Sequence, residues 1–479
     1  MGNSMGPPAA LPGARIAHEL SGSVITIEPR DHQMIHTLTE RGLTAEYPAA
    51  YQIGSGKIGY TYLVRIGDYL FESPASWYRS HGWDTSPGYD RMKDLEFDRL
   101  VDSGCLFCHA DRAEFTGVEG RRFSGQQPAA IACDRCHGPG DDHARRPSAK
   151  NIVNPAKLPA AARNSICEQC HLEGETRVLN PGKHWLDFHP GEPFEVTAVT
   201  YIASQDGSPA RAVSQAEQLA RSKCVAGSGG RLWCATCHDP HKQTADAHTV
   251  HEVCMSCHAT LSKAAHPAGV AECVSCHMPR LSPEDIPHSA STDHRIPRRP
   301  ERRDNSNFSP DTLVPWREPP AQFRDRDLAL ADLLVSVKYR SNTLRDSGSK
   351  LLNGIAVSRD ENDSTLLAAL AGNALERKNL ELGLALARRA VASAPDSGHA
   401  ALILAIALRQ AGDLTGAERE YRHAAELDPS QRQAWIDLAM LYRSQGRMED
   451  VMATIDRYLA WNPQSLLFRL QKAGLSGQH

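Results

Sequence analysis

The 479-residue sequence has few aromatic residues, 6% in all, and contains no run of eighteen apolar residues. Without such a run we expect no membrane span. The formal net charge is −4, so the basic excess typical of proteins that bind nucleic acids or anionic membranes is missing. Residues 100–300 are also poor in Leu, Ile and Phe. This stretch would not bury an ordinary apolar core on its own.

What the sequence does contain is a repeated pentapeptide, Cys-x-x-Cys-His. Its six copies are Cys105/Cys108/His109, Cys133/Cys136/His137, Cys167/Cys170/His171, Cys234/Cys237/His238, Cys254/Cys257/His258 and Cys273/Cys276/His277. The chain has 13 Cys and 22 His, and this composition predicts roughly 0.02 copies by chance. The pentapeptide is the attachment signature of c-type haem, in which two thiols bond the porphyrin vinyl groups and the imidazole reaches the iron. We therefore expect six covalent c-type haems, each iron ligated by its motif histidine.

Two other uses of Cys-x-x-Cys pairs explain the pattern less well. Zinc sites use such pairs but do not need a histidine after each one, and six sites would have too many ligands. Structural disulfides show no preference for a following histidine. The thirteenth cysteine, Cys224, belongs to no motif, and we expect it to be a small buried apolar residue.

Six porphyrins would also supply the missing core, because each is a large apolar plate that Gly- and Pro-rich loops can wrap. Haem c is attached outside the cytoplasmic membrane, so we expect a periplasmic or extracellular protein. The first residues, MGNSMGPPAALPG, lack the basic and apolar segments of an export signal. We expect that this signal has been removed or lies outside the sequence.

Residues 22–72 alternate between apolar and polar positions in SGSVITIEP and YTYLVRIGDYLF, which predicts strands. Gly54, Gly56 and Gly59 form G-x-G-x-x-G, but a strand-like run follows them where a dinucleotide site needs a helix, so we predict a turn. Trp77, Tyr78, Trp83 and Tyr89 are expected to pack against the first haem. Between the third and fourth motifs, FEVTAVTYIA predicts a small β region and Ser214–Ser222 a helix.

The last three motifs begin at Cys234, Cys254 and Cys273, and this short spacing predicts that their porphyrins lie close together. A proline-rich, charged segment follows from Arg295 to Pro320 and indicates a linker or a wrapped arm. Its arginines 298, 299, 302 and 303 are either partners of haem propionates or an ordinary solvated basic run. Helical periodicity resumes at Arg324.

The C-terminal part has an internal repeat. Pro395, Pro429 and Pro463 are 34 residues apart, which is the tetratricopeptide period. We predict three helical hairpins from about Ser364, closed by a capping segment SLLFRLQKAG. Such solenoids present surfaces to partner proteins. The proline-rich segment before the repeats predicts a separable module.

An electron-transfer haem needs a second axial ligand, and the histidines outside the motifs are numerous enough to supply six. Methionine is scarce, and Met255 and Met278 stand beside attachment residues. Ligation by two histidines is therefore expected at most of the irons.

The segments CLFCHA, CDRCHGPGDDH, NPAKLP, CEQCHLEGE, CATCHDPHK, CVSCHMPR and HSASTDHRI resemble, in order, those of multihaem cytochromes c with C-terminal tetratricopeptide repeats. This group is related to pentahaem nitrite reductase, hydroxylamine oxidoreductase and octahaem cytochromes, and the resemblance covers about residues 50–300. It implies that the distal ligands are His143, His241, His266, His288 and His294. For the sixth we choose His36 over His18, with His248 and His251 as rivals. The chain lacks both a further N-terminal motif and the lysine-ligated motif of the nitrite reductase.

We therefore expect a mainly α and irregular, haem-cored protein. Residues 1–98 would form a small β-rich region packing on the haem domain, 99–297 a hexahaem domain, 298–362 a linker and helix, and 363–479 a tetratricopeptide solenoid. The expected function is electron transfer to redox partners that the repeats dock, in a homo-oligomer or assembly if they also self-associate. One alternative is an oxidoreductase whose one open haem acts on a small nitrogen or sulfur compound. Another is a redox sensor in which the repeats are the main element.

Overall fold

The chain folds into two compact units, each described here by itself. The computed structural model describes residues 4–111, 113–124, 130–205, 211, 213–242, 247–259, 273–281, 291–299, 308–356, 358 and 362–475, without the side chains of 247–249. One unit, called the middle unit for its place in the sequence, contains Ile131–Arg345. The other, the sheet–solenoid unit, combines the described residues of Asn3–Ala130 with those of Asp346–His479. No helix among the described residues is both long and apolar enough to cross a membrane.

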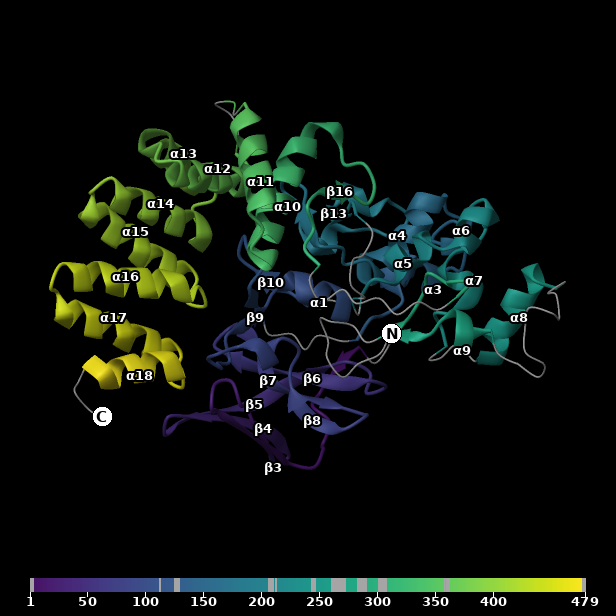
Figure 1. The fold of residues 1–479 in the computed structure, drawn as a ribbon, viewed down its shortest axis with the longest axis horizontal. Coiled ribbons are helices and arrows are strands. Elements are labelled where there is room, and N and C mark those ends of the chain that lie inside the picture. Colours follow the sequence, from purple (N-terminus) through teal and green to yellow (C-terminus); the bar gives the residue numbers. More distant parts are fainter. Residues whose placement is uncertain are drawn as a thin grey trace. The chain divides into compact units, whose positions relative to one another are not determined.

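An antiparallel sheet of nine strands forms the first half of the sheet–solenoid unit (Figure 1). Strands β2 to β8 pair in sequence order, while β1 pairs with β5 and β9 with β7. The strands are β1 Met5–Gly6, β2 Ala14–Ala17, β3 Val24–Arg30, β4 Gln33–Glu40, β5 Leu43–Ile53, β6 Gly59–Ile66, β7 Tyr69–Tyr78, β8 Gly82–Thr85 and β9 Arg99–Val101. The β region is confirmed and is larger than the sequence predicted. Gly54 and Gly56 lie in the β5–β6 connection with φ of 109° and 73°, and strand β6 begins at Gly59, so the predicted turn is confirmed.

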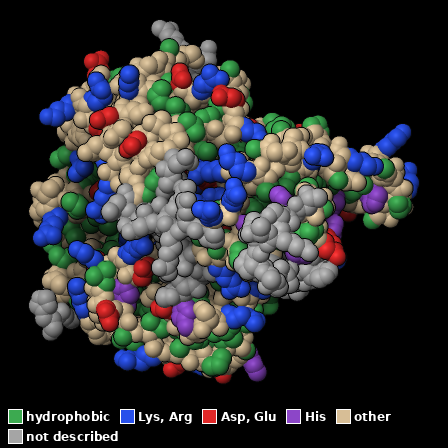
Figure 2. Space-filling view, turned by 45° about the vertical axis from the view of Figure 1, so that its right-hand side comes forward, with side chains coloured by type: hydrophobic (Ala, Val, Ile, Leu, Met, Phe, Trp, Pro, Cys, Tyr) green, Lys and Arg blue, Asp and Glu red, His purple; other side chains and the backbone are tan. Residues whose placement is uncertain are grey.

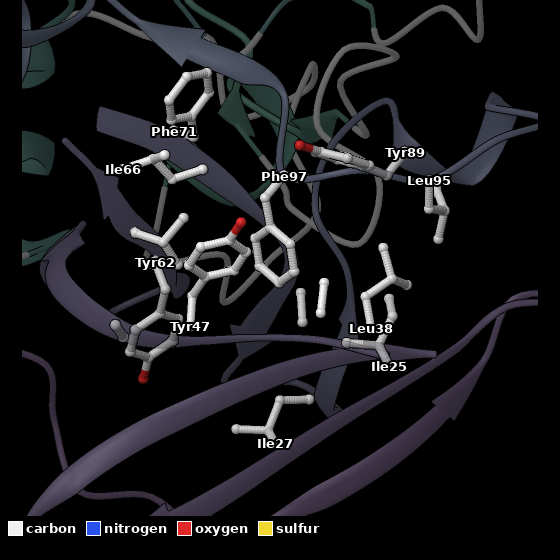
Figure 3. Close-up of a cluster of buried hydrophobic side chains, with 14 of the residues drawn as sticks. Ile25, Ile27, Leu38, Tyr47, Tyr62, Ile66, Phe71, Tyr89, Leu95 and Phe97 are labelled. Carbon is white, nitrogen blue, oxygen red and sulfur yellow. The ribbon is translucent and has the colours of Figure 1, made fainter. Parts of the chain in front are cut away.

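The two faces of the sheet support different apolar clusters, because side chains alternate along each strand. One cluster, drawn in Figure 3, includes Ile25, Leu38, Tyr62 and Phe97. The other includes Leu63 and Leu70 and extends to the first motif helix, α1 (Ser103–His109), through Leu106. Trp77, Trp83 and Tyr89 pack with the first cluster, and Tyr78 is also buried. The expectation that these aromatic side chains line a haem is corrected for Trp77, Trp83 and Tyr89, because they complete the core of the sheet itself.

The first motif helix therefore belongs to the sheet–solenoid unit, while the other five motifs belong to the middle unit. The division at residue 130 does not coincide with the boundary expected at residue 98. Residues 99–297, which were expected to form one domain, are therefore divided between the two units. The first motif goes with the sheet because Leu106 and Ala110 bury their side chains against it.

The solenoid is built as the repeat period predicts. Its helices are α12 Ser364–Glu376, α13 Leu380–Ser393, α14 Gly398–Gln410, α15 Leu414–Leu427, α16 Arg432–Ser444, α17 Met448–Trp461 and α18 Leu466–Leu475. They form the three hairpins and the capping helix. The preceding α11, Asn342–Gly354, crosses the division between the units.

The solenoid meets the sheet and the segment that follows α1 through equivalent positions of successive repeats. Asp428 and Asn462 are 34 residues apart. Asp428 accepts from Arg121 at 2.8 Å, and Asn462 accepts from the Tyr47 hydroxyl at 2.5 Å. The connection between the first and second hairpins joins the same series, because the Ser397 hydroxyl donates to Glu119 at 2.7 Å.

Apolar contacts complete this joint. Leu466, at the start of α18, is 1% exposed and belongs to the cluster of Figure 3, and Trp461 packs against it. The Trp461 ring contacts Tyr69 edge-on at 5.7 Å between centroids. Gly67 is required opposite it, since its φ is 57° and a Cβ there would lie 3.1 Å from Trp461 Nε1. The expectation of a separable solenoid is corrected, because part of it is the core of the sheet.

The middle unit consists of short helices, small strands and long connections. Its helices are α2 Asp134–His137, α3 Asp141–Arg145, α4 Ala160–His171, α5 Gln215–Ala220, α6 Lys223–Ser228, α7 Cys234–Cys237, α8 Ala247–Cys257, α9 Val274–His277 and α10 Arg324–Tyr339. A three-stranded sheet joins β12 Thr176–Leu179, β13 Ala198–Ala203 and β16 Leu313–Pro315, and a two-stranded one joins β14 Arg280–Leu281 and β15 Ser291–Thr292. The β region after the third motif, the helix near Ser214–Ser222 and the helical start at Arg324 are confirmed.

The joint between sheet and solenoid can be tested by truncating one side chain. Leu466→Ala should lower the free energy of unfolding by about 2–5 kcal/mol, because it opens a cavity in the shared core. Leu475→Ala, at the 37%-exposed end of the same helix, should change it by less than about 0.5 kcal/mol. Denaturant unfolding of the haem-loaded protein measures both values. Equal effects of the two substitutions would show that the solenoid does not share the core.

The same joint should depend on pH. Burial raises the pKa of Glu96 from 4.5 to about 7, with Asp98 raising it further while the Leu467 N–H and Arg432 lower it. Between these two values the folded protein holds a proton that the unfolded chain releases, so stability should fall as pH rises from about 5 to about 7. Glu96→Gln should reduce this fall, whereas Glu426→Gln, half-exposed beside Arg457, should leave it unchanged. Unfolding curves at pH 5 and pH 8 measure the change in stability for each variant. An unaltered pH dependence in Glu96→Gln would show that Glu96 is not its source.

Candidate functional site

Each of the six motifs folds as a helical turn, which brings its three functional side chains to one side. In four motifs the histidine N–H donates to the carbonyl of the first cysteine; for His137 and Cys133 this distance is 2.9 Å. The other two motifs end α1 and α4. Residues i, i+3 and i+4 share one face of a helix. The two thiols and the imidazole of each motif therefore face the same space.

The motif thiols are accessible. Cysteine is ordinarily among the most buried residue types, so accessible thiols in every motif fit attachment to a group outside the protein chain. Cys224 is also partly exposed, which corrects the expectation that it is buried. Histidine side chains likewise reach the molecular surface, as the purple atoms of Figure 2 show. Four of the twelve motif thiols are exposed, namely Cys105, Cys133, Cys257 and Cys276, and the other eight, among them Cys108 and Cys170, are partly exposed.

The chain by itself does not enclose these attachment residues. In α1, Leu106 and Phe107 are buried, and Cys108 lies beside them with its side chain partly exposed. In α4, the buried Gln169 likewise precedes the partly exposed Cys170. Cys276 is exposed because α9 is a single turn that buries none of its residues. The haem-cored domain expected from the sequence stays a prediction.

Two motif imidazoles are oriented by the backbone through Nδ1. His137 Nδ1 lies 2.8 Å from the carbonyl oxygen of Val153, and His277 Nδ1 lies 2.9 Å from that of Pro297. A carbonyl accepts only, so Nδ1 carries the proton in both rings and Nε2 is the unprotonated nitrogen. Metal-ligating histidines commonly donate their second ring N–H to a carbonyl in this way.

Two pairs of imidazoles are spaced as the two axial ligands of one iron would be. The rings of His137 and His241 have centroids 6.0 Å apart and planes 18° apart. Those of His238 and His294 are 6.1 Å and 27° apart. Taking about 2 Å for each metal–nitrogen bond and about 1 Å from nitrogen to ring centroid, two ligands across one metal ion have centroids about 6 Å apart. The structure thus brings predicted distal ligands, His241 and His294, to two motif histidines.

The fifth motif differs from these two. It has the same backbone hydrogen bond as the second, fourth and sixth motifs, since the His258 N–H donates to the Cys254 carbonyl at 3.0 Å. His258 follows the end of α8 at Cys257, and its side chain is exposed. Within the ranges that the structure describes, no second imidazole faces His258 as His241 faces His137. The structure therefore does not place the two-histidine ligation expected at this motif, which stays a prediction.

The position of His294 is fixed by three neighbours. Its backbone N–H donates to the Gln218 side chain at 2.9 Å, and its Nδ1 lies 2.7 Å from the Thr292 carbonyl oxygen. The buried Asp293 beside it holds Arg295 in a two-point ion pair, with Oδ2 2.6 Å from Nη2. Burial lowers the pKa of His294, and the nearby rings of His238 and His171 lower it further. A neutral imidazole is the form that binds metals.

Neighbouring motifs are also close to one another. The Cys234 side chain raises the pKa of Cys167, which places the third and fourth motifs within hydrogen-bonding reach. Burial, together with the Cys273 thiol, raises the pKa of Cys254 to about 11, so the fifth and sixth motifs are neighbours as well. The short spacing of the last three motifs agrees with the proximity of the fifth and sixth, whereas the proximity of the third and fourth was not predicted, because the longest gap between motifs separates them.

The structure describes only some of the other predicted ligands. His143 lies on α3 with Nδ1 3.1 Å from both Ser148 O and Asn151 Oδ1. His266 and His288 lie outside the described residues, as does the side chain of the rival His248. The rival His251 contacts the Cys273 thiol through Nδ1 at 3.3 Å. Of the four arginines considered for propionates, 298 and 299 are exposed, and 302 and 303 lie outside the described residues.

His36 is placed differently from the prediction. It lies fully buried on β4, on the face that carries Met34 and Leu38, with Nδ1 2.7 Å from Ser73 Oγ. Burial lowers its pKa to about 3. The first motif helix packs on the opposite face, so the structure does not bring His36 to the motif of its own unit. The rival His18 is bonded locally to Ser21. The alternation of β4 was the signal in the sequence that His36 shares the face of Leu38.

The motif histidine of this unit is His109, whose side chain is accessible to solvent. Burial lowers its pKa. The helix that carries it is anchored at its start by Asp102, which accepts from the Cys105 N–H at 3.1 Å, and at its end by Ser4, which donates to the His109 carbonyl.

The donor geometry also bears on the choice of metal group. A structural zinc site needs four converging side chains. Among the described residues, no group of three or more His, Cys, Asp and Glu side chains converges in this way. A haem iron needs only one imidazole on each side of a plane, and paired histidines beside accessible thiols fit that requirement.

Comparison with known proteins identifies the C-terminal part. The tetratricopeptide repeat family matches residues 408–473, in agreement with the 34-residue period. No curated protein matches the chain. The resemblance to multihaem cytochromes stays a prediction.

Similar solved structures include the crystal structure of MamA, with 17% identity over 26% of this chain and 73% of that one and a TM-score of 0.23. The Arabidopsis OM64 TPR domain aligns with 16% identity over 24% of this chain and 96% of its own length, with a TM-score of 0.21. YrrB, described as a TPR protein with an unusual peptide-binding site, aligns with 17% identity over 30% of this chain and 73% of its own, with a TM-score of 0.24.

The histidine pairs can be tested by removing the distal member. In haem-loaded protein, His241→Ala and His294→Ala should each convert one low-spin haem to high spin, because one axial position loses its imidazole. His423→Ala, in solenoid helix α15, should change nothing. Electron paramagnetic resonance of the oxidised protein measures the spin states. A spectrum unchanged by His294→Ala would show that its ring is not an axial ligand.

Proposed function

We propose that this protein is an extracytoplasmic c-type cytochrome that transfers electrons through six covalently bound haems. The observation that carries the proposal is the pairing of His137 with His241 and of His238 with His294 at the separation of two axial ligands. The six helical turns with accessible thiols support the same interpretation, since each offers two attachment points and one imidazole on a single face.

When bound, haem supplies an iron that is reversibly reduced by one electron. The residues of this chain attach it, orient its ligands and close its axial positions. A closed iron changes little between its two redox states, which favours electron transfer, whereas an open position favours binding of a small substrate. The two histidine pairs have the separation needed to supply both axial ligands of an iron, and this favours the carrier over the oxidoreductase.

The order of the motifs in space supports a route for electrons. The thiols of the third and fourth motifs are neighbours, and so are those of the fifth and sixth. Porphyrins attached to adjacent sulfur atoms would lie close to each other. Electrons would then pass between neighbouring haems without any large movement of the chain.

We further propose that the solenoid docks the redox partner. Its inter-repeat loops contact the sheet and the segment that follows α1, so the partner would use the opposite edge. There, Leu414 and Met448 start the second helices of successive hairpins, and their side chains are 39% and 41% exposed. The solenoid is then a fixed part of the unit that carries the first motif.

The proposal predicts six haem additions in the mass spectrum of protein produced with a cytochrome c maturation system. It also predicts low-spin haems that do not bind carbon monoxide or nitrite after reduction, because both axial positions are filled. Cys133→Ala with Cys136→Ala should leave five haems, and Cys224→Ala should leave six. Five or fewer additions on fully matured wild-type protein would overturn the haem count, and one high-spin haem that binds nitrite would favour the enzyme.

A further inference from the structure

A single loop reaches two of the imidazoles discussed above. Residues 148–153 follow α3 in the middle unit. At the far end of this loop, Val153 is tied to His137 in both directions: its carbonyl lies 2.8 Å from His137 Nδ1, and its N–H donates to the His137 carbonyl at 3.1 Å. The loop therefore fixes the proximal ligand of the second motif through the backbone.

The beginning of the loop contacts His143 through one backbone group and one side chain. Nδ1 of His143 lies 3.1 Å from the Ser148 carbonyl oxygen and 3.1 Å from Asn151 Oδ1. The Asn151 amide is oriented by its other end, because Nδ2 donates to the Arg146 carbonyl at 3.0 Å. With its NH2 group committed, Asn151 presents the oxygen to His143. The Ser148 N–H also approaches Nδ1, as a donor at 3.4 Å, but the two acceptors at 3.1 Å are closer and favour a proton on Nδ1 and an unprotonated Nε2.

We propose that Asn151 is a positioning residue that sets the ligand strength of His143, and with it the reduction potential of one haem. This inference rests on the proposed function and on the prediction, implied by the family resemblance, that His143 is one of the axial ligands. The physical basis is that an acceptor at Nδ1 draws the proton outward and increases the electron density that Nε2 offers to a metal. Ser148 contributes a backbone carbonyl, so Asn151 is the side chain through which this contact can be varied.

The direction of the effect follows from charge. A stronger acceptor at Nδ1 gives the imidazole more anionic character, which stabilises ferric over ferrous iron and lowers the potential for adding one electron. Asn151→Asp replaces the amide oxygen with a carboxylate oxygen of similar geometry and should lower one potential. Asn151→Leu has a similar size but no acceptor and should raise it. Removing such outer partners commonly changes metal affinity by about 10–100-fold.

The loop also offers a matched control. Asn154 lies three residues further along, and its side-chain oxygen accepts from the Ala156 N–H at 3.1 Å, with no histidine contact among the described residues. Asn154→Asp adds the same charge close to the same motif. A general electrostatic effect would therefore move the potentials in both aspartate variants, whereas an effect carried by the hydrogen bond would appear only at Asn151.

The experiment is a spectroelectrochemical titration of the full-length, haem-loaded protein in four forms: wild type, Asn151→Asp, Asn151→Leu and Asn154→Asp. We expect one component to shift down in Asn151→Asp and up in Asn151→Leu. Each shift should correspond to about a tenfold change in the one-electron equilibrium constant, which is about 59 mV. Asn154→Asp should match the wild type.

Haem counts by mass spectrometry separate the two levels of inference. Fewer than six haems in the wild type would contradict the proposed function. Six haems with potentials that do not move in either Asn151 variant, or that move equally in Asn154→Asp, would overturn the role of Asn151 alone. If the Asn151→Asp protein does not take up its haems, the test uses Asn151→Leu alone, because that variant adds no charge. An upward shift of one potential would then support the role of Asn151, and no shift would overturn it.

Discussion

The proposed function depends on one physical constraint: an imidazole that is to serve as a metal ligand needs a fixed ring orientation, which a hydrogen bond at its second nitrogen supplies. A helical turn places the ring beside two thiols, but the turn leaves rotation about the side chain free. Carbonyl groups from Val153 and Pro297 remove this freedom at His137 and His277 by accepting from Nδ1. Long connections with little regular structure are useful here, because their backbone carbonyls are not consumed by helices or sheets.

The sheet–solenoid unit meets a different requirement. Its sheet has apolar side chains on both faces. On one face, these side chains pack against Trp461 and Leu466 from the C-terminal end of the chain. The other face carries the helix of the first motif through Leu106. The solenoid therefore stabilises the platform on which that motif stands, even though about 350 residues separate them in the sequence.

The sequence predicted what depends on local pattern. The three hairpins and their cap, the turn at Gly54–Gly59 and the helix from Arg324 all follow from periodicity or turn chemistry within a short window. The resemblance led to the prediction of His241 and His294, whose rings lie about 6 Å from motif imidazoles, and their role as ligands stays a prediction. The sequence could not indicate that Leu466 enters the core of the sheet, since nothing near Leu466 specifies a partner about 400 residues away. His36 lies away from the motif of its unit for a related reason: which face of the sheet receives the motif helix depends on contacts between distant segments.

The series of contacts made by Asp428 and Asn462 has a consequence for how this solenoid can vary. Free tetratricopeptide arrays can gain or lose repeats, because each one touches only its neighbours. Here two successive repeats contact two different partners: Asp428 accepts from Arg121, in the segment that follows α1, and Asn462 accepts from Tyr47, on strand β5. Inserting one repeat between Asp428 and Asn462 would move Asn462 away from Tyr47, and deleting one repeat would leave either Arg121 or Tyr47 without its partner. These two contacts therefore fix the number of repeats that can lie between them.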